Sequence, residues 1–180
     1  DIQPLSYAWG RIWDTAIGLA VGLTINTLVF PYDNSRQIRA TVESLDRELL
    51  RFLEEMFDGD DVLPDSARME QMVADMGNQL TIFSNQRFFL RRGSQKQQIE
   101  AFRICQGKAR ELLARMEILS RMEQPGRLTK ENRNRLRSAG AVIGDTRPLK
   151  NPKERDIVVN YHVAQLLKLR KELLEALRGG

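Results

Sequence analysis

The 180-residue sequence contains a single cysteine, Cys105, and a single histidine, His162. One cysteine excludes an internal disulfide bond and a metal site built from several cysteines. One histidine excludes a site with several histidine ligands and gives little support to a Ser-His-Asp triad. The sequence also lacks the glycine-rich loop with which many proteins bind phosphate groups. We therefore expect no catalytic residues, no metal, no cofactor and no enzymatic activity.

Proline and glycine are also scarce, with 6 and 12 residues spread over the whole chain. Both residues disfavour helix interiors, whereas the abundant leucine, arginine, glutamate, glutamine and methionine favour them. No segment alternates apolar and polar residues between turn signals in the manner of a β-strand. The composition therefore predicts an all-α protein.

Acidic and basic residues are unevenly distributed along the chain. Residues 33–65 contain 4 Lys or Arg against 10 Asp or Glu, whereas residues 127–155 contain 9 against 3. A basic stretch attracts anions, among them nucleic acids, lipid head groups and anionic solutes. Composition alone does not distinguish these partners.

The most apolar part of the sequence runs from residue 12 to residue 32 and contains one charged residue, Asp14. About 20 helical residues, at roughly 1.5 Å per residue, cover the ~30 Å hydrocarbon core of a membrane. Aromatic residues lie at both ends, as is typical at membrane interfaces: Tyr7, Trp9, Trp13, Phe30 and Tyr32. We expect residues 1–32 to be the terminal transmembrane helix of a larger membrane domain. The alternative is a buried helix of a soluble bundle.

Small and polar residues recur at every fourth position of this segment: Gly10, Asp14, Gly18, Gly22 and Asn26. This spacing places them on one face of a helix. The pair Gly18 and Gly22 allows a second helix to approach closely, and the Asn26 amide can hydrogen-bond across such a contact. We expect Gly18, Gly22 and Asn26 to be helix-packing residues that face other membrane helices.

Basic residues near the ends of the segment predict its orientation, because cytoplasmic flanks of membrane helices are enriched in lysine and arginine. Only Arg11 precedes the apolar stretch, whereas four arginines follow it: Arg36, Arg39, Arg47 and Arg51. Residues 33–180 are therefore expected to lie in the cytoplasm.

The remainder of the chain has the periodicity of long amphipathic helices. In residues 34–57 the apolar positions alternate in steps of four and three: Ile38, Val42, Leu45, Leu49, Phe52 and Met56. A methionine-rich stripe in residues 66–89 suits either core packing or an adaptable binding surface. Capping residues that can begin the later helices follow at intervals: Asp65, Ser66, Ser94, Thr129 and Asn151. We expect residues 33–180 to form an antiparallel bundle of four or five long helices.

The basic stretch between residues 127 and 155 is rich in arginine, whose planar fork suits phosphates and carboxylates. Its members are Arg127, Lys130, Arg133, Arg135, Arg137, Arg147, Lys150, Lys153 and Arg155. One interpretation is nucleic-acid binding, although aromatic residues are scarce there and no helix-turn-helix pattern is clear. The others are a solvated face, pairing with the acidic helix at residues 34–57, and attraction to anionic lipid.

Tyr161 and His162 are adjacent in the expected last helix, which runs from about residue 152 to residue 177. A single histidine in such a place suits a packed or hydrogen-bonded structural role. The alternative role is proton sensing, because histidine titrates near neutral pH.

Several of these residues together resemble the last membrane helix of the aromatic acid exporter family, within the wider fusaric acid resistance-like superfamily. They are Arg11, Asp14-Thr15, Gly18, Asn26 and Phe30-Pro31. The helical remainder, with Tyr161-His162 in its final helix, resembles the C-terminal cytoplasmic domain of that family. The resemblance covers essentially the whole chain.

The resemblance implies the C-terminal part of a bacterial inner-membrane transporter, a suggested exporter of aromatic carboxylic acids or related organic anions. Its partners would be further N-terminal membrane helices that this sequence lacks, the lipid bilayer and the anionic substrate. Related plant anion channels are dimers, so a homodimer is implied by analogy. The helical tail would serve regulation or oligomerisation. The alternative function is a soluble helical adaptor or nucleic-acid-binding bundle that uses its Arg-rich face.

In this setting Arg11 gains a specific expectation, because charges at the entrance of a membrane helix are costly and often functional. Its guanidinium can attract a carboxylate substrate. It can also pair with Asp14, which lies three residues further along the same helix face.

Overall fold

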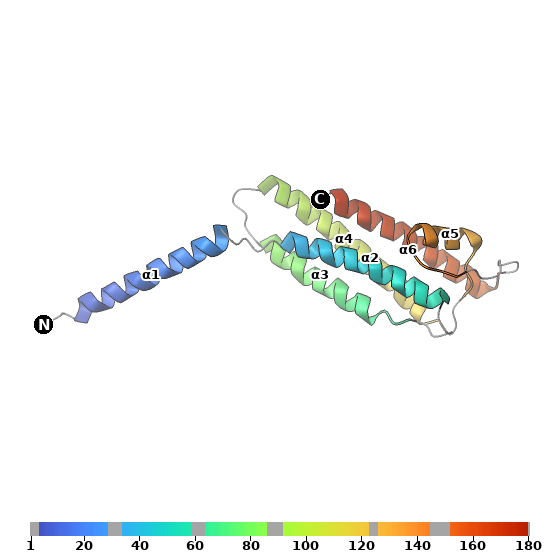
Figure 1. The fold of residues 1–180 in the computed structure, drawn as a ribbon, viewed down its shortest axis with the longest axis horizontal. Helices are drawn as coiled ribbons and strands as arrows, with labels where there is room; N and C mark the ends of the chain where they lie inside the picture. Colours follow the sequence, from blue (N-terminus) through green and yellow to red (C-terminus); the bar gives the residue numbers. More distant parts are fainter. Residues whose placement is uncertain are drawn as a thin grey trace. The chain divides into compact units, whose positions relative to one another are not determined.

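The computed structural model describes residues 4–28, 34–58, 64–85, 92–122, 126–144 and 152–179. All regular secondary structure in these ranges is helical, so the predicted all-α class is confirmed (Figure 1). The helices are α1 (Pro4–Leu28), α2 (Asn34–Asp58), α3 (Ala67–Asn85), α4 (Arg92–Ser120), α5 (Lys130–Ser138) and α6 (Glu154–Gly179).

The chain divides into two compact units, Asp1–Asp33 and Asn34–Gly180. In the described part of the first unit the helix is α1, which includes residues 12–28 of the apolar segment. Among the helices that the structure describes, none has both the length and the apolar character needed to cross a membrane. The membrane-spanning role expected for residues 1–32 is not confirmed.

The second unit is a helical bundle in which four long helices lie side by side (Figure 1). Helix α4 runs antiparallel to α6, since Gln97 lies near Gly179 at one end and Lys108 pairs with Glu172 further along. Helices α2 and α6 are also antiparallel. The Arg39 guanidinium donates to the carbonyl of Leu177 at 2.9 Å, and Asp46 pairs with Arg170. The fifth helix, α5, has only 9 residues and packs mainly on α6.

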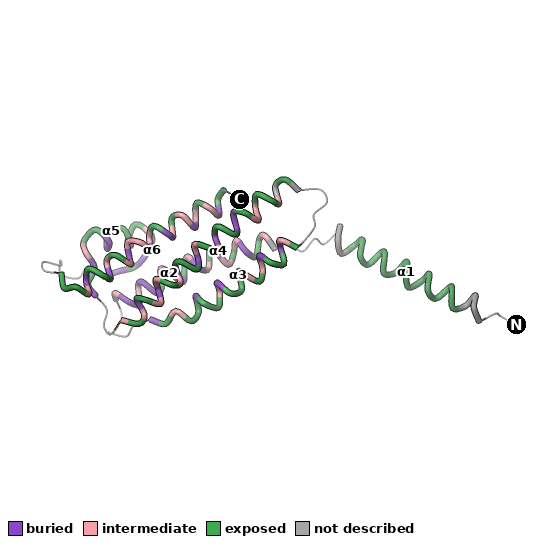
Figure 2. The backbone as a smooth tube through the Cα atoms, turned by 180° about the vertical axis from the view of Figure 1, so that it is seen from behind, coloured by how far each residue is buried: buried purple, intermediate pink, exposed green. Residues whose placement is uncertain are grey.

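The apolar stripes read from the sequence form the core of this bundle, as the buried residues along its helices show (Figure 2). The stripe of α2 is buried at all six expected positions: Ile38, Val42, Leu45, Leu49, Phe52 and Met56. The stripe of α3 is buried as well: Met69, Val73, Met76, Leu80 and Phe83. The methionine-rich stripe is therefore mainly core rather than an exposed binding surface.

The helix starts follow the capping residues in part. The Asp65 carboxylate accepts a hydrogen bond from the backbone N–H of Ala67 at 3.0 Å, where α3 begins. The Thr129 hydroxyl accepts one from the N–H of Asn132 at 3.3 Å and caps α5, as predicted. Helix α4 begins at Arg92, so the start predicted at Ser94 was wrong by two residues. Asn151 lies outside the described residues.

Candidate functional site

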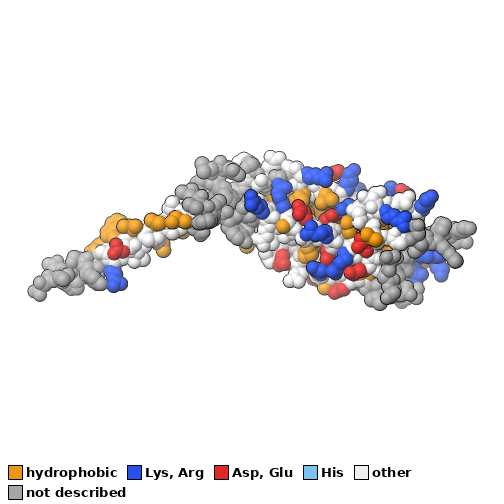
Figure 3. Space-filling model, viewed as in Figure 1, with side chains coloured by type: hydrophobic (Ala, Val, Ile, Leu, Met, Phe, Trp, Pro, Cys, Tyr) orange, Lys and Arg blue, Asp and Glu red, His pale blue; other side chains and the backbone are white. Residues whose placement is uncertain are grey.

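Helix α1 carries the most exposed apolar surface of the described chain. Every side chain described between residues 8 and 25 is exposed (Figure 2). The large apolar members are Trp9, Ile12, Trp13, Ile17, Leu19, Val21, Leu23 and Ile25. In the space-filling view apolar side chains cover much of the described part of α1, whereas charges of both signs are scattered over the bundle (Figure 3). A continuous apolar surface of this kind marks a site of contact with a partner or a membrane.

The predicted helix-packing residues lie on α1 as the sequence indicated. A Cβ atom added to Gly18 or Gly22 would meet no atom within 4 Å, so the space beside both glycines is open. Asn26 belongs to α1, but its side chain lies outside the described residues, as do Phe30 and Pro31.

Polar side chains on α1 are partly satisfied by the helix itself. The Thr15 hydroxyl donates to the carbonyl of Arg11 at 2.8 Å, and the Thr24 hydroxyl donates to that of Ala20 at 2.7 Å. Within the described part of the chain, Asp14 makes no ion pair, so the pairing with Arg11 considered from the sequence is not formed. Arg11 is exposed on the surface of α1.

Several arginines of the Arg-rich stretch make contacts within the α5 region. The Arg137 guanidinium donates to the carbonyl of Ile143 through Nε at 3.1 Å and Nη2 at 2.8 Å. Arg135 pairs with Glu131 at 2.6 Å, and Arg133 is buried. Two further members, Arg147 and Lys150, lie outside the described residues. These contacts use several of the arginines to hold the α5 region together.

Tyr161 and His162 lie at the α4–α6 contact, where they meet Arg115 of α4. The two rings are edge to face with centroids 5.4 Å apart, and the Arg115 guanidinium lies 5.9 Å from the Tyr161 ring centre. No described residue offers a hydrogen-bond partner to the buried Nδ1 of His162. Burial, and secondarily the positive charge of Arg115, lower the pKa of His162 below its ordinary value of 6.5.

This lowered pKa predicts an acid-sensitive contribution to stability. The unfolded chain takes up the His162 proton more readily than the folded chain. The free energy of unfolding should therefore fall as the pH drops through 6.5 and the folded-state pKa. We expect urea unfolding of residues 34–180 to show this loss between pH 7.5 and 5.5. The His162→Gln variant should show a shallower dependence in the same window. Equal slopes for both proteins would contradict the assignment.

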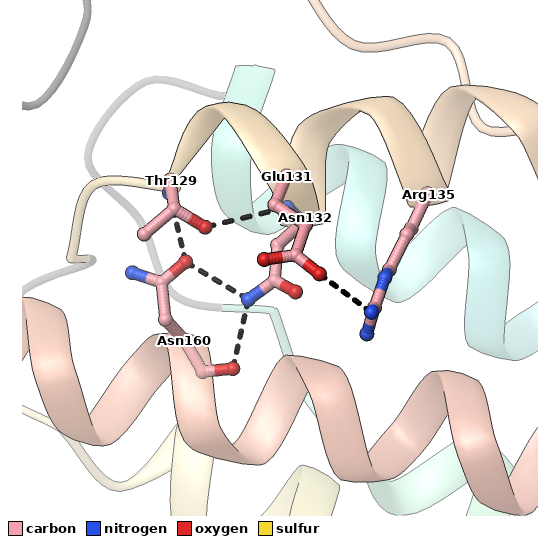
Figure 4. A network of polar contacts seen from close by, with 5 residues as sticks. All are labelled: Thr129, Glu131, Asn132, Arg135 and Asn160. Atoms are coloured by element: carbon pink, nitrogen blue, oxygen red, sulfur yellow. Dashed lines mark hydrogen bonds and ion pairs between the residues drawn. The ribbon is translucent and has the colours of Figure 1, made fainter.

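A polar cluster that the sequence did not reveal joins the start of α5 to α6 (Figure 4). The Asn160 side-chain oxygen accepts from the backbone N–H of Thr129 at 2.8 Å and from the Asn132 amide at 3.0 Å. One turn earlier, the Asp156 carboxylate accepts from the N–H of Arg127 at 2.8 Å and of Lys153 at 2.9 Å. Asp156 lies in the first turn of α6, where an acidic residue hints at capping, but the partners of Asp156 and Asn160 near residue 128 are distant in sequence.

The hydrogen bonds of this cluster join the start of α5 to α6, and they depend on an ionised Asp156. Asp156 is buried and its pKa is lowered: burial raises it, but the two backbone N–H donors and the charges of Arg127 and Arg155 lower it by more.

Burial raises the pKa of the Cys105 thiol to about 11, which leaves it unreactive at neutral pH. Among the described residues, no group of three or more potential metal ligands is found.

Comparison of the chain with protein-family models, curated proteins and solved structures finds no match.

Proposed function

We propose that this chain is the C-terminal part of an inner-membrane transporter of organic anions. In this proposal α1 packs within the membrane domain of the complete protein, and residues 34–180 form a cytoplasmic helical module. The observation that carries the proposal is the exposed apolar surface of α1, which extends along the whole described length of the helix.

This surface is unfavourable in water. Burying one large apolar side chain stabilises a protein by about 1.5–3 kcal/mol relative to exposing it. The eight large apolar residues of α1 are all exposed, from 45% for Ile25 to 66% for Leu19. A lipid or protein environment removes this cost, so α1 is expected to have a permanent cover in the complete protein.

The polar groups of α1 support a position among other membrane helices rather than alone in lipid. A helix surrounded by lipid must satisfy its polar groups internally, as the Thr15 and Thr24 hydroxyls do. A helix that packs on others can also carry small and polar residues on the contact face. The open space beside Gly18 and Gly22 suits a neighbouring backbone.

The proposed substrate class comes from the resemblance to the aromatic acid exporter family. The residue of interest for substrate binding is Arg11. Arg11 is exposed near the N-terminal end of α1. Arginine recognises carboxylates through paired hydrogen bonds. An aromatic carboxylate is therefore the proposed substrate, with Arg11 as an attracting residue in the complete protein.

Membrane association is the first test of this function. The full chain, produced in a bacterial host, should float with membranes in a density gradient and resist alkaline extraction. Residues 34–180 should remain in the supernatant, because they form a compact unit with their own core. The Leu19→Asp/Leu23→Asp variant should lose most of the floating fraction, since a carboxylate near the centre of a membrane helix costs about 3 kcal/mol.

Two results would count against the proposal. One is a full chain that is monodisperse in buffer without detergent, with residues 12–28 protected from protease. The other is salt-sensitive retention of nucleic acid by residues 34–180, which would favour the alternative function on the Arg-rich face. The substrate class is tested separately, by following efflux of aromatic carboxylates from cells that contain or lack the complete protein.

A further inference from the structure

An exposed apolar patch lies on the N-terminal half of α6. It consists of Ile157, Val158 and Tyr161, and we refer to it as the α6 patch. Ile157 is 60% exposed, Tyr161 55% and Val158 39%. The three α6 residues lie within four positions of one another and share one helix face.

The patch differs sharply from the rest of the same face of α6. Further along, this face carries charged residues in local ion pairs. Lys168 lies 3.9 Å from Glu172, and Lys171 lies 3.7 Å from Glu175. Such a charged face is the ordinary solution for a solvated helix. The change from charged to apolar residues within α6 therefore indicates a contact surface at its N-terminal half.

Tyr161 is held in place by its neighbours before any partner arrives. The His162 ring lies against it edge to face, and Arg115 lies over its ring from α4. A fixed aromatic ring beside an arginine and branched apolar residues is the composition found at the energetic centre of protein interfaces. A side chain that is already ordered also loses less entropy on binding.

We propose that the α6 patch binds a second copy of this chain, with the two α6 helices antiparallel and a two-fold axis near Tyr161. Charge complementarity of the patch with itself selects this partner. Glu154 and Lys168 lie seven residues before and after Tyr161, so all three share one face of the helix. A two-fold axis at Tyr161 brings Glu154 of each copy opposite Lys168 of the other.

The charges at these two positions are available for such a contact. Glu154 is exposed and makes no ion pair with any residue in the described ranges. Lys168 is exposed, and its pair with Glu172 is long, at 3.9 Å. An interface of this kind is isologous, so each favourable contact occurs twice. The proposal goes beyond the transport function and requires only residues 34–180.

A charge-swap experiment tests the proposal. Sedimentation should show residues 34–180 as dimers. Glu154→Lys and Lys168→Glu should each weaken dimerisation by about tenfold, or about 1.4 kcal/mol. The Glu154→Lys/Lys168→Glu double variant should return to within about threefold of the original, since opposite charges face each other again. Glu70 of α3 and Arg110 of α4 are exposed and line a groove between these two helices, which we call the α3–α4 groove. Glu70→Lys and Arg110→Glu make the same charge changes there and should leave dimerisation unchanged.

A covalent test locates the axis independently of the charges. The Tyr161→Cys variant should give a disulfide-linked dimer under mild oxidation, because residue 161 of both copies lies near the axis. The native Cys105 is buried and should give no background. The control is the Asn78→Cys variant, which changes an exposed residue of the α3–α4 groove and should not cross-link.

Three outcomes would overturn the proposal. Residues 34–180 could remain monomeric at high concentration. The double charge swap could be as weak as the single variants. Cross-linking through residue 161 could be no faster than through residue 78. Because all measurements use residues 34–180, they are independent of the membrane association of α1.

Discussion

Replacing Asp156 with alanine is expected to destabilise residues 34–180 by about 3 kcal/mol, because each hydrogen bond to a charged group contributes about 1.5–3 kcal/mol. Asp156 is only 1% exposed. It accepts hydrogen bonds from the backbone N–H groups of Arg127 and Lys153. In the alanine variant both donors lose their acceptor, and the segment before α5 loses one of its attachments to α6.

Urea unfolding at pH 7 measures this effect, with Asp75→Ala as the matched control. Asp75 is an exposed aspartate of α3, so its replacement should change stability by no more than about 0.5 kcal/mol in either direction. The pKa of Asp156 is lowered below 3.8 in the folded chain. Its contribution is therefore present above pH 3.8 and is lost as the pH falls through the folded-state value. The difference between the original protein and the alanine variant should shrink below about pH 4.

Equal stabilities of the Asp156→Ala and Asp75→Ala variants would contradict the role of Asp156. The Asp156→Asn variant tests whether both carboxylate oxygens are needed. It keeps one acceptor oxygen, but an NH2 group replaces the second acceptor and the negative charge is lost, so its stability should be lower than that of the original protein.

The parts of the fold that the sequence predicts are those set by local periodicity. The burial of Val42, Leu49 and Met56 follows from steps of three and four residues, which place them on one face of α2 whatever that face contacts. The cap at Thr129 is predictable for a similar reason, because its hydroxyl reaches an N–H group only three residues away. In both cases the sequence neighbours contain the information.

The parts that the sequence does not predict depend on residues far apart in the chain. Asp156 and Asn160 accept hydrogen bonds from residues 29 and 31 positions earlier, and nothing in the local sequence of α6 specifies those donors. The contacts of the arginines in residues 127–155 are equally hard to predict from the sequence. Arg137 looks like part of a basic surface in the sequence, yet its guanidinium binds a carbonyl at Ile143. Composition counts charges but not the contacts that use them.

The interaction surfaces show a third case. Both α1 and the α6 patch appear in the sequence as apolar residues at helical spacing, the same signal that core helices give. Tyr161 and Ile157 are apolar residues of the same helix as Leu166 and Leu173. The structure separates them, since Leu166 and Leu173 are fully buried whereas Tyr161 and Ile157 are more than half exposed.

Breaking the ion pair between Asp46 and Arg170 should produce the second large effect, because this pair joins the first and last helices of the bundle. Arg170 contacts the carboxylate through Nε at 2.5 Å and Nη2 at 3.0 Å, a two-pronged contact. Both side chains are more than four-fifths buried. Arg170→Met should destabilise residues 34–180 by about 2–3 kcal/mol, since removing one partner leaves a poorly solvated charge behind.

A double-mutant cycle distinguishes this pair from ordinary surface charges. Asp46→Leu alone should cost a similar amount, whereas Asp46→Leu/Arg170→Met should cost less than the sum of the two by at least about 1 kcal/mol. The exposed pair of Glu100 and Arg103 is the control, because it lies at 3.9 Å on one helix and should show no measurable coupling. Additive losses at residues 46 and 170 would mean that apolar packing alone closes the bundle between α2 and α6.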